Sequence, residues 1–147
     1  MTKAQLQEEL KQSMLARNSE KTSTLRMLLS AIGYLETQKV GYVASEEDVQ
    51  TVIQKQVKQH RDSIEQYEAA GRSELADKEK KELLLLQAYL PAQMSEEEIK
   101  ILVQKAISET GASGVLDLGK VMGALMPQTK GKADSGLVSK IVRELLQ

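Results

Sequence analysis

The sequence predicts an all-α protein with a four-helix N-terminal unit, which includes a long helical hairpin, and a small three-helix C-terminal unit. Leu, Lys, Glu, Gln and Ala are abundant, and these residue types favour helices. Prolines number only two in 147 residues, and β-branched runs are few. Apolar residues recur at intervals of three and four along most of the chain, as on the buried face of a helix.

Four helices are expected before the first proline, over residues 3–17, 20–40, 45–69 and 73–89. The third begins at Ser45, where a hydroxyl N-cap precedes three acidic residues that the helix dipole favours. The second and third helices are long enough to pair as an antiparallel hairpin. The expected inner face of the third helix consists of Val49, Ile53, Val57, His60, Ile64 and Tyr67.

Three shorter helices are expected after the first proline. Ser95 and the three glutamates that follow it form a capping box that opens a helix ending at Gly111. Residues 111–136 hold six of the nine glycines, which predicts short elements: a helix over 117–126, a turn, and a last helix over 134–146.

The linker that follows the fourth helix is the expected domain boundary. Leu90 precedes Pro91, and a residue before proline is driven out of the helical region. We therefore predict an N-terminal helical domain over residues 1–93 and a C-terminal three-helix domain over residues 94–147.

The residues that the chain lacks exclude several classes of site. Without Cys, the sequence has no disulfide framework, thiolate metal site or thiol nucleophile. Phe and Trp are absent too, so stacking platforms for single-stranded nucleic acid are not expected. The longest apolar run is four residues, which predicts no membrane span, and the first residues follow a helix pattern rather than a signal peptide. The expected location is the cytoplasm.

No metal, cofactor or catalytic constellation is predicted. His60 has no carboxylate at helical spacing, so we interpret it as a partly buried residue of the apolar stripe. Glu79 and Glu82 are interpreted as part of a charged helix face. Gly114–Lys120 matches the start of a phosphate-binding loop, but Val121 lacks the hydroxyl that would hold Mg²⁺.

Residues 119–143 carry five basic residues and one acid, Asp134, although the whole chain has a formal charge of −1. Asp134 is expected to cap the last helix, so that its charge is taken up by the first amides. Lys130, Gly131 and Lys132 are expected to form a mobile turn before that helix, an arrangement suited to phosphate. The alternative, lysines that are merely solvated, stays open. The candidate nucleic-acid-binding residues are Lys120, Lys130, Gly131, Lys132, Lys140 and Arg143.

The same segment also contains two glycines at a spacing that permits close helix contacts. Gly119 and Gly123 lie four residues apart, and small residues at that spacing let a helix or a ligand backbone approach closely. Tight packing within the small C-terminal unit is the expected purpose.

The stretch from Gly119 to Asp134, followed by an amphipathic last helix, resembles the GatB/YqeY family. In that family the same pattern ends the B subunit of the bacterial tRNA-dependent amidotransferase, as a helical tail domain that contacts tRNA. Residues 25–28, 57–63 and 82–98 also resemble stand-alone YqeY proteins. The resemblance implies a two-part all-α protein without the ATP site or the amidase chemistry, which belong to other domains of the amidotransferase.

The resulting hypothesis is a non-catalytic accessory protein that binds tRNA, or a tRNA-charging or amidotransferase enzyme, in connection with the tRNA-dependent amidation of Glu or Asp. A first alternative is a protein–protein adaptor that docks through the N-terminal hairpin, where Lys55, Lys58 and Arg61 lie outside the apolar stripe. A second is a carbon–nitrogen ligase-associated activity, with glutamine as amide donor, only within a larger complex. No enzymatic activity is expected of the isolated chain.

Overall fold

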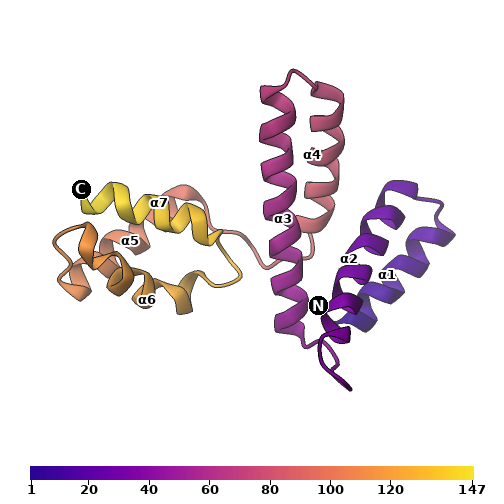
Figure 1. Cartoon of the computed structure of the whole chain (residues 1–147), viewed down its shortest axis with the longest axis horizontal. Helices are drawn as coiled ribbons and strands as arrows, with labels where there is room; N and C mark the ends of the chain where they lie inside the picture. The colour runs from indigo at the N-terminus through magenta and orange to yellow at the C-terminus, as the bar shows by residue number, and fades with distance from the viewer. The chain divides into compact units, whose positions relative to one another are not determined.

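The computed structural model describes residues 1–147 and is entirely helical, with seven α-helices, one short 3₁₀-helix and no strand (Figure 1). This confirms the predicted all-α class. Contacts divide the chain into two compact units, Met1–Leu90 and Pro91–Gln147, so residues 91–93 fall in the second unit rather than the first. None of the helices combines the length and the apolar character needed to cross a membrane.

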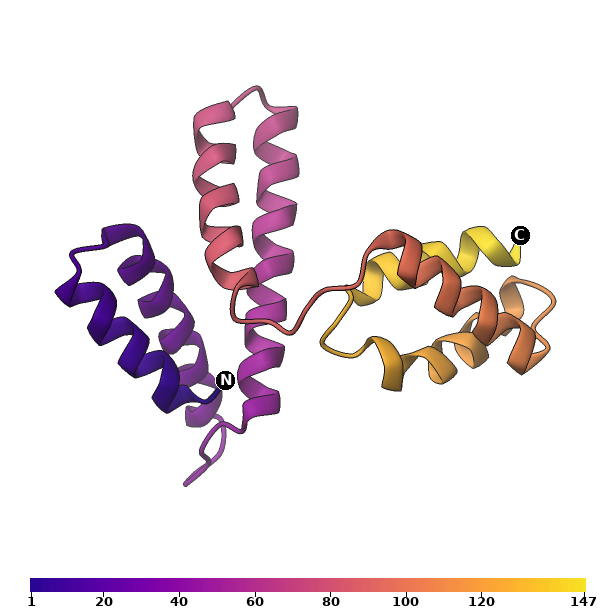
Figure 2. The same cartoon turned by 180° about the vertical axis from the view of Figure 1, so that it is seen from behind.

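The first unit consists of two helical hairpins (Figures 1 and 2). In one, α1 (Lys3–Leu15) pairs with α2 (Ser19–Thr37), and in the other α3 (Glu46–Ala69) pairs with α4 (Ser73–Gln87). The prediction that the second and third helices pair as a hairpin is wrong, because α3 packs mainly on α4. Only three residues separate α3 from α4, a connection that makes antiparallel neighbours, whereas eight separate α2 from α3.

The core of the first unit is formed by α1, α2, the N-terminal half of α3 and the end of α4. Beyond Val57, the α3–α4 hairpin extends past this core, and Ile64 and Tyr67 are only half-buried there. Met14 on α1 is 50% exposed and lies outside this core. The buried core residues are Leu6, Leu25, Leu28, Ile32, Val49, Ile53, Val57 and Leu86.

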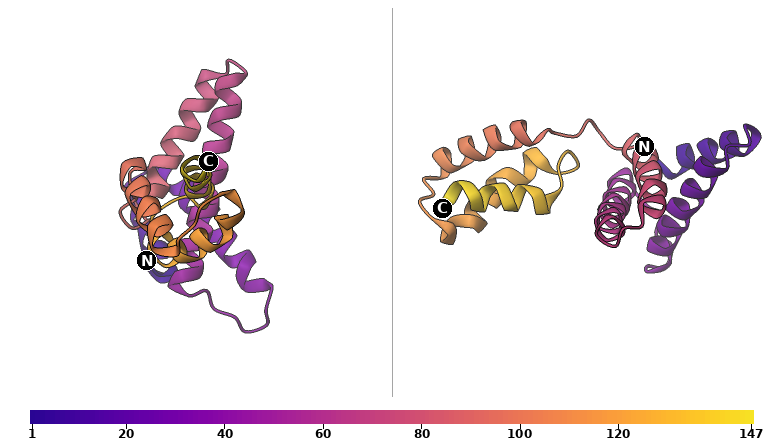
Figure 3. Two further views of the ribbon diagram at one scale, coloured as in Figure 1. Left: turned by 90° about the vertical axis from the view of Figure 1, so that its left-hand side faces the viewer. Right: turned by 90° about the horizontal axis from the view of Figure 1, so that it is seen from above.

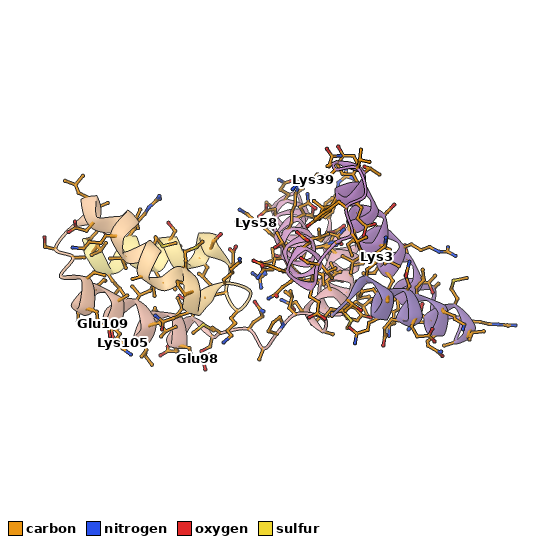
Figure 4. The ribbon with its side chains drawn as sticks, turned by 90° about the horizontal axis from the view of Figure 1, so that it is seen from below. Lys3, Lys39, Lys58, Glu98, Lys105 and Glu109 are labelled. Atoms are coloured by element: carbon orange, nitrogen blue, oxygen red, sulfur yellow. The ribbon has the colours of Figure 1, made fainter.

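Two carboxylates organise the connection between α2 and α3. Glu36 accepts hydrogen bonds from the Ala44 amide, at 2.9 Å, and from the Lys3 ammonium, at 2.5 Å. Asp48 accepts from the Ser45 hydroxyl and amide and from the Tyr42 hydroxyl. These hydrogen bonds, led by that of the Ser45 hydroxyl, lower the pKa of Asp48 to about 2. Figure 4 labels Lys3 on α1 and Lys39, whose ammonium lies 5.2 Å from the centre of the Tyr42 ring.

The second unit contains α5 (Glu96–Thr110), the 3₁₀-helix η1 (Val115–Asp117), α6 (Leu118–Thr129) and α7 (Ser135–Leu146) (Figure 3). Each of the three α-helices contacts the other two. Ser95 and Glu98 form the predicted capping box at the start of α5, where Figure 4 labels Glu98. The buried core residues are Ile99, Val103, Ala106, Val121, Leu125, Val138, Ile141, Val142 and Leu146.

Helix α6 runs three residues further than the sequence predicts, through Pro127 to Thr129. A proline inside a helix leaves the carbonyl four residues earlier without its amide donor, and its ring crowds that carbonyl. Here that earlier residue is Gly123, which is exposed to solvent. Water can therefore solvate its carbonyl, which explains why the last turn of α6 tolerates the proline.

Candidate nucleic-acid interface

The turn between α6 and α7 places two lysines on either side of a buried glycine. Lys130 and Lys132 are exposed, whereas Gly131 is buried and has a φ of +80°. This left-handed conformation favours glycine, because a side chain with a Cβ atom is strained there. The Thr129 carbonyl accepts hydrogen bonds from the amides of Lys132 and Ala133, each at 3.0 Å. The turn is thus a closed, hydrogen-bonded loop that directs two cationic side chains to solvent.

The turn is also attached to the segment that leads into α5. The side-chain amide of Gln93 donates to the Gly131 carbonyl at 3.0 Å, and the Met94 amide donates to the Lys132 carbonyl at 2.8 Å. The sequence predicts a mobile turn, but these two bonds hold its backbone at consecutive carbonyls. Sequence reasoning missed Gln93, since nothing in a pattern of periodicity pairs residues that lie 38 positions apart.

The N-terminus of α7 follows directly. Asp134 occupies the N-cap position with extended backbone, but its carboxylate accepts no capping hydrogen bond from the first-turn amides. The expectation that these amides take up its charge is therefore wrong. The first turn of α7 also contains no acidic residue. The amide end of α7, with its partial positive charge, adjoins the turn that carries Lys130 and Lys132.

The other three predicted basic residues occupy two further places. Lys120 lies in the first turn of α6, ten residues before Lys130, so about 15 Å of helix separates them at ~1.5 Å per residue. Lys140 and Arg143 are three residues apart on α7, which places them as neighbours on its exposed side. The structure thus brings Lys130, Gly131 and Lys132 together, and Lys140 with Arg143, but separates Lys120 from the turn.

Gly119 and Gly123 lie on the solvent side of α6. Both are exposed, and a Cβ atom built on either glycine would meet no other atom within 4 Å. The prediction that they serve packing within the unit is therefore wrong. They leave an open strip of helix surface next to Lys120, which a ligand backbone can approach closely.

A separate group of titratable side chains lies in the first unit. Nδ1 of His60 on α3 is 2.5 Å from a carboxylate oxygen of Glu79 and 3.8 Å from one of Glu82, both on α4. His60 is partly buried, as predicted, with a side chain that is 13% exposed. No carboxylate lies at helical spacing from His60 within α3, so local spacing could not predict this pairing, which the α3–α4 hairpin creates.

Comparison with known proteins identifies the family. The model of the YqeY-like protein family matches residues 3–146, nearly the whole chain. The chain belongs to the YqeY-like family. This confirms the resemblance to YqeY proteins that the sequence motifs indicate.

Fungal proteins are among the relatives of this YqeY-like chain. One from Pyrenophora tritici-repentis, named "Altered inheritance of mitochondria protein 41, mitochondrial", is 34% identical over 146 residues, which cover 96% of this chain and 78% of the relative. A protein of the same name from Vanderwaltozyma polyspora is 35% identical over 106 residues, 71% of this chain and 57% of the relative. An uncharacterized protein of Schizosaccharomyces pombe is 34% identical over 92 residues, 63% of this chain and 74% of the relative. Neither kind of name denotes an enzymatic activity.

Proposed function

We propose that this YqeY-like protein is a non-catalytic accessory protein that binds tRNA through its second unit. The observation that carries the proposal is the turn between α6 and α7. Its backbone is held by Gln93 and Met94, it presents Lys130 and Lys132 to solvent, and it leads into a helix end without a side-chain cap. Amides at a helix N-terminus, together with ammonium groups, suit the phosphates of a nucleic-acid backbone.

The remaining candidate residues offer further phosphate contacts on the same unit. Lys120 lies beside the open strip at Gly119 and Gly123, and Lys140 and Arg143 line α7. Such contacts bind phosphates and fix the orientation of the RNA without reading its sequence. Discrimination between RNAs then comes from their shape. We propose that the tRNA is one handled by a tRNA-charging or amidotransferase enzyme, in whichever compartment charging takes place, whether the cytoplasm or mitochondria.

Salt dependence tests the proposal directly. In Lys130→Ala/Lys132→Ala, the slope of log affinity for tRNA against log salt should fall by about one to two, since each phosphate contact contributes about 0.7 to 0.9. Filter binding or fluorescence anisotropy with total tRNA at several salt concentrations measures both slope and affinity.

A matched control comes from the same unit. Lys100 and Lys105 on α5 each face a glutamate one turn away, at 3.7 and 3.8 Å, and Figure 4 labels Lys105 with Glu109. Lys100→Ala/Lys105→Ala removes the same charge but should leave the slope unchanged. Absence of tRNA binding at low salt, or equal losses in the two double variants, would contradict the proposal.

A protein–protein adaptor is the second candidate. The observation in its favour is the basic row on α3, where Lys55, Lys58 and Arg61 are all exposed at intervals of three residues. Figure 4 labels Lys58 on this helix. Capture of a synthetase or amidotransferase by the tagged protein after nuclease treatment favours the adaptor, whereas capture that nuclease abolishes favours tRNA.

Assays of the isolated chain address the enzymatic alternative. We expect no glutaminase or amidotransferase turnover, since the resemblance implies that this chemistry lies in other domains of the amidotransferase. Robust turnover by the purified chain, retained after a second purification step, would overturn the accessory role.

A further inference from the structure

His60, Glu79 and Glu82, here called the His60 cluster, converge where α3 and α4 leave the core of the first unit. One potential ligand atom from each residue lies within 4.8 Å of the other two. The three side chains are partly buried, with exposed fractions of 13% for His60, 21% for Glu79 and 17% for Glu82. Neither carboxylate forms an ion pair with a lysine or arginine. Two carboxylates therefore share a single imidazole.

We propose that the His60 cluster binds a divalent transition-metal ion of the zinc type. An imidazole nitrogen is a ligand for zinc, iron and nickel, whereas sites for Mg²⁺ and Ca²⁺ are built from oxygen. A divalent cation offsets the negative charge that two neighbouring carboxylates can carry, and imidazole is the commonest metal ligand among protein side chains. Three protein ligands leave further coordination positions to water, as in open zinc sites.

The observed distances are compatible with a shared ion after small side-chain movements. Zinc lies about 2.0 to 2.2 Å from nitrogen and oxygen ligands, so ligand atoms in one shell are roughly 3 to 3.5 Å apart. The contact of His60 with Glu79, at 2.5 Å, must lengthen, and that with Glu82, at 3.8 Å, must shorten slightly. Glutamate side chains have the rotatable bonds for both changes.

All three side chains of the cluster retain some contact with solvent. Glu82 also lines a surface hollow, together with Ser19, Glu20 and Ser23 of α2 and Lys78 and Lys81 of α4. Lys81 lies 3.6 Å from Glu20, which offsets part of its charge. Glu82 therefore connects the partly buried cluster with solvent, and a cation can enter by this route without unfolding of the hairpin.

A bound ion would link α3 to α4 at the base of the part of the hairpin that extends past the core. Val57 is the last fully packed core residue of α3, and His60 follows it by three positions. Beyond this level, α3 contributes no further residue to the buried core of the first unit. The site is thus a structural clamp, and it is independent of tRNA binding.

The single histidine makes a direct test possible without any variant. Protein freed of metal by a chelator is titrated with ZnCl₂, and long-range ¹⁵N–¹H correlation spectra report the ring nitrogens of His60. We expect the Nδ1 signal to shift and the change to saturate at one equivalent, while MgCl₂ leaves the ring unchanged. An imidazole that does not respond to zinc, or that responds only to a large excess, overturns the proposal.

Calorimetric titration with ZnCl₂ then assigns the oxygen ligands. Glu79→Gln and Glu82→Gln should each weaken zinc affinity about tenfold or more, because even residues that only hydrogen-bond to a metal ligand contribute that much. His60→Ala should abolish zinc binding. Glu65→Gln is the matched control, because it removes an exposed carboxylate from the same hairpin and should change nothing. Equal zinc affinity in the wild type and the Glu79 and Glu82 variants would refute the site.

Discussion

The two units use their charged side chains differently. In the first unit, ion pairs connect separate helices: Lys3 with Glu36, at 2.5 Å, and Lys21 with Glu9, at 2.5 Å. In the second unit, Lys100 pairs with Glu96 and Lys105 with Glu109, in each case one turn apart on α5. Lys120, Lys132, Lys140 and Arg143 form no ion pair at all. The first unit thus combines an apolar core with ion pairs between its helices, whereas in the second unit Lys120, Lys132, Lys140 and Arg143 remain outside any ion pair.

The largest effect expected from this difference concerns the core of the second unit. Leu125 is completely buried on α6, and Leu125→Ala should cost about 3 kcal/mol, because it removes apolar contacts and leaves a cavity. A unit of this size is only marginally stable, so a loss of that size should unfold most of it. Urea titration followed by circular dichroism measures the change.

The tyrosines provide the control, since Tyr34, Tyr42, Tyr67 and Tyr89 all lie in the first unit. In Leu125→Ala, the urea midpoint reported by tyrosine fluorescence should equal that of the wild type. Part of the circular dichroism signal should be lost at a lower urea concentration than in the wild type. Leu28→Ala, a matched change in the first core, should instead move the tyrosine transition. If both variants move both signals equally, the two units unfold together and the comparison fails.

The next effect concerns the two capping boxes that contain a carboxylate, Ser45 with Asp48 and Ser95 with Glu98, which differ in their neighbours. Asp48 has the Tyr42 hydroxyl as an additional donor and a pKa of about 2, whereas the pKa of Glu98 is lowered by the Ser95 amide and hydroxyl alone. A carboxyl group with a lowered pKa in the folded state stabilises the protein above its ordinary pKa, and this contribution disappears as pH falls through the lowered value. The stability advantage of the wild type over Asp48→Asn should therefore decline as the pH falls from about 4 to about 2.

Urea midpoints at several pH values measure this decline. Glu98→Gln is the matching variant in the second unit. The stability difference between Glu98→Gln and the wild type should disappear at a higher pH than the difference between Asp48→Asn and the wild type. If the stability difference between the wild type and Asp48→Asn stays constant from pH 5 to pH 2, the charge of Asp48 contributes nothing to stability.

The smallest effect concerns single ion pairs. Lys21→Met should lower the free energy of unfolding by about 0.5 to 1 kcal/mol, because the pair with Glu9 connects α1 to α2. Lys105→Met should cost about 0.3 kcal/mol, the usual value for a pair one turn apart on an exposed helix. Chemical denaturation at low and high salt separates the charge contribution from lost packing. A larger loss for Lys105→Met than for Lys21→Met would reverse the comparison.

Much of the helix pattern follows from local signals. Ser45 and Ser95 mark the starts of α3 and α5 because each supplies a hydroxyl to the first-turn amides. Gly71 and Gly111 mark ends because both adopt positive φ. Local signals failed at Pro127, where an exposed Gly123 permits one more helical turn.

The candidate sites depend more on contacts between distant residues. The charge pattern predicted the Lys130–Lys132 turn, because five basic residues and one acid within 25 positions are visible in the sequence. The bond from Gln93 to Gly131 was not predictable, since it joins residues of separate elements. The clustering of Glu79 and Glu82 around His60 was missed for the same reason.

The sequence by itself determined which segments are helical, where most of them begin and end, and which residues are basic near the C-terminus. These properties depend on interactions between residues within a few positions of one another, so they can be read locally. Only the tertiary structure decided that α3 pairs with α4, that Gly119 and Gly123 face solvent, and that two carboxylates meet His60. Those outcomes depend on how apolar faces are buried against one another, and many pairings of amphipathic helices satisfy the same local pattern.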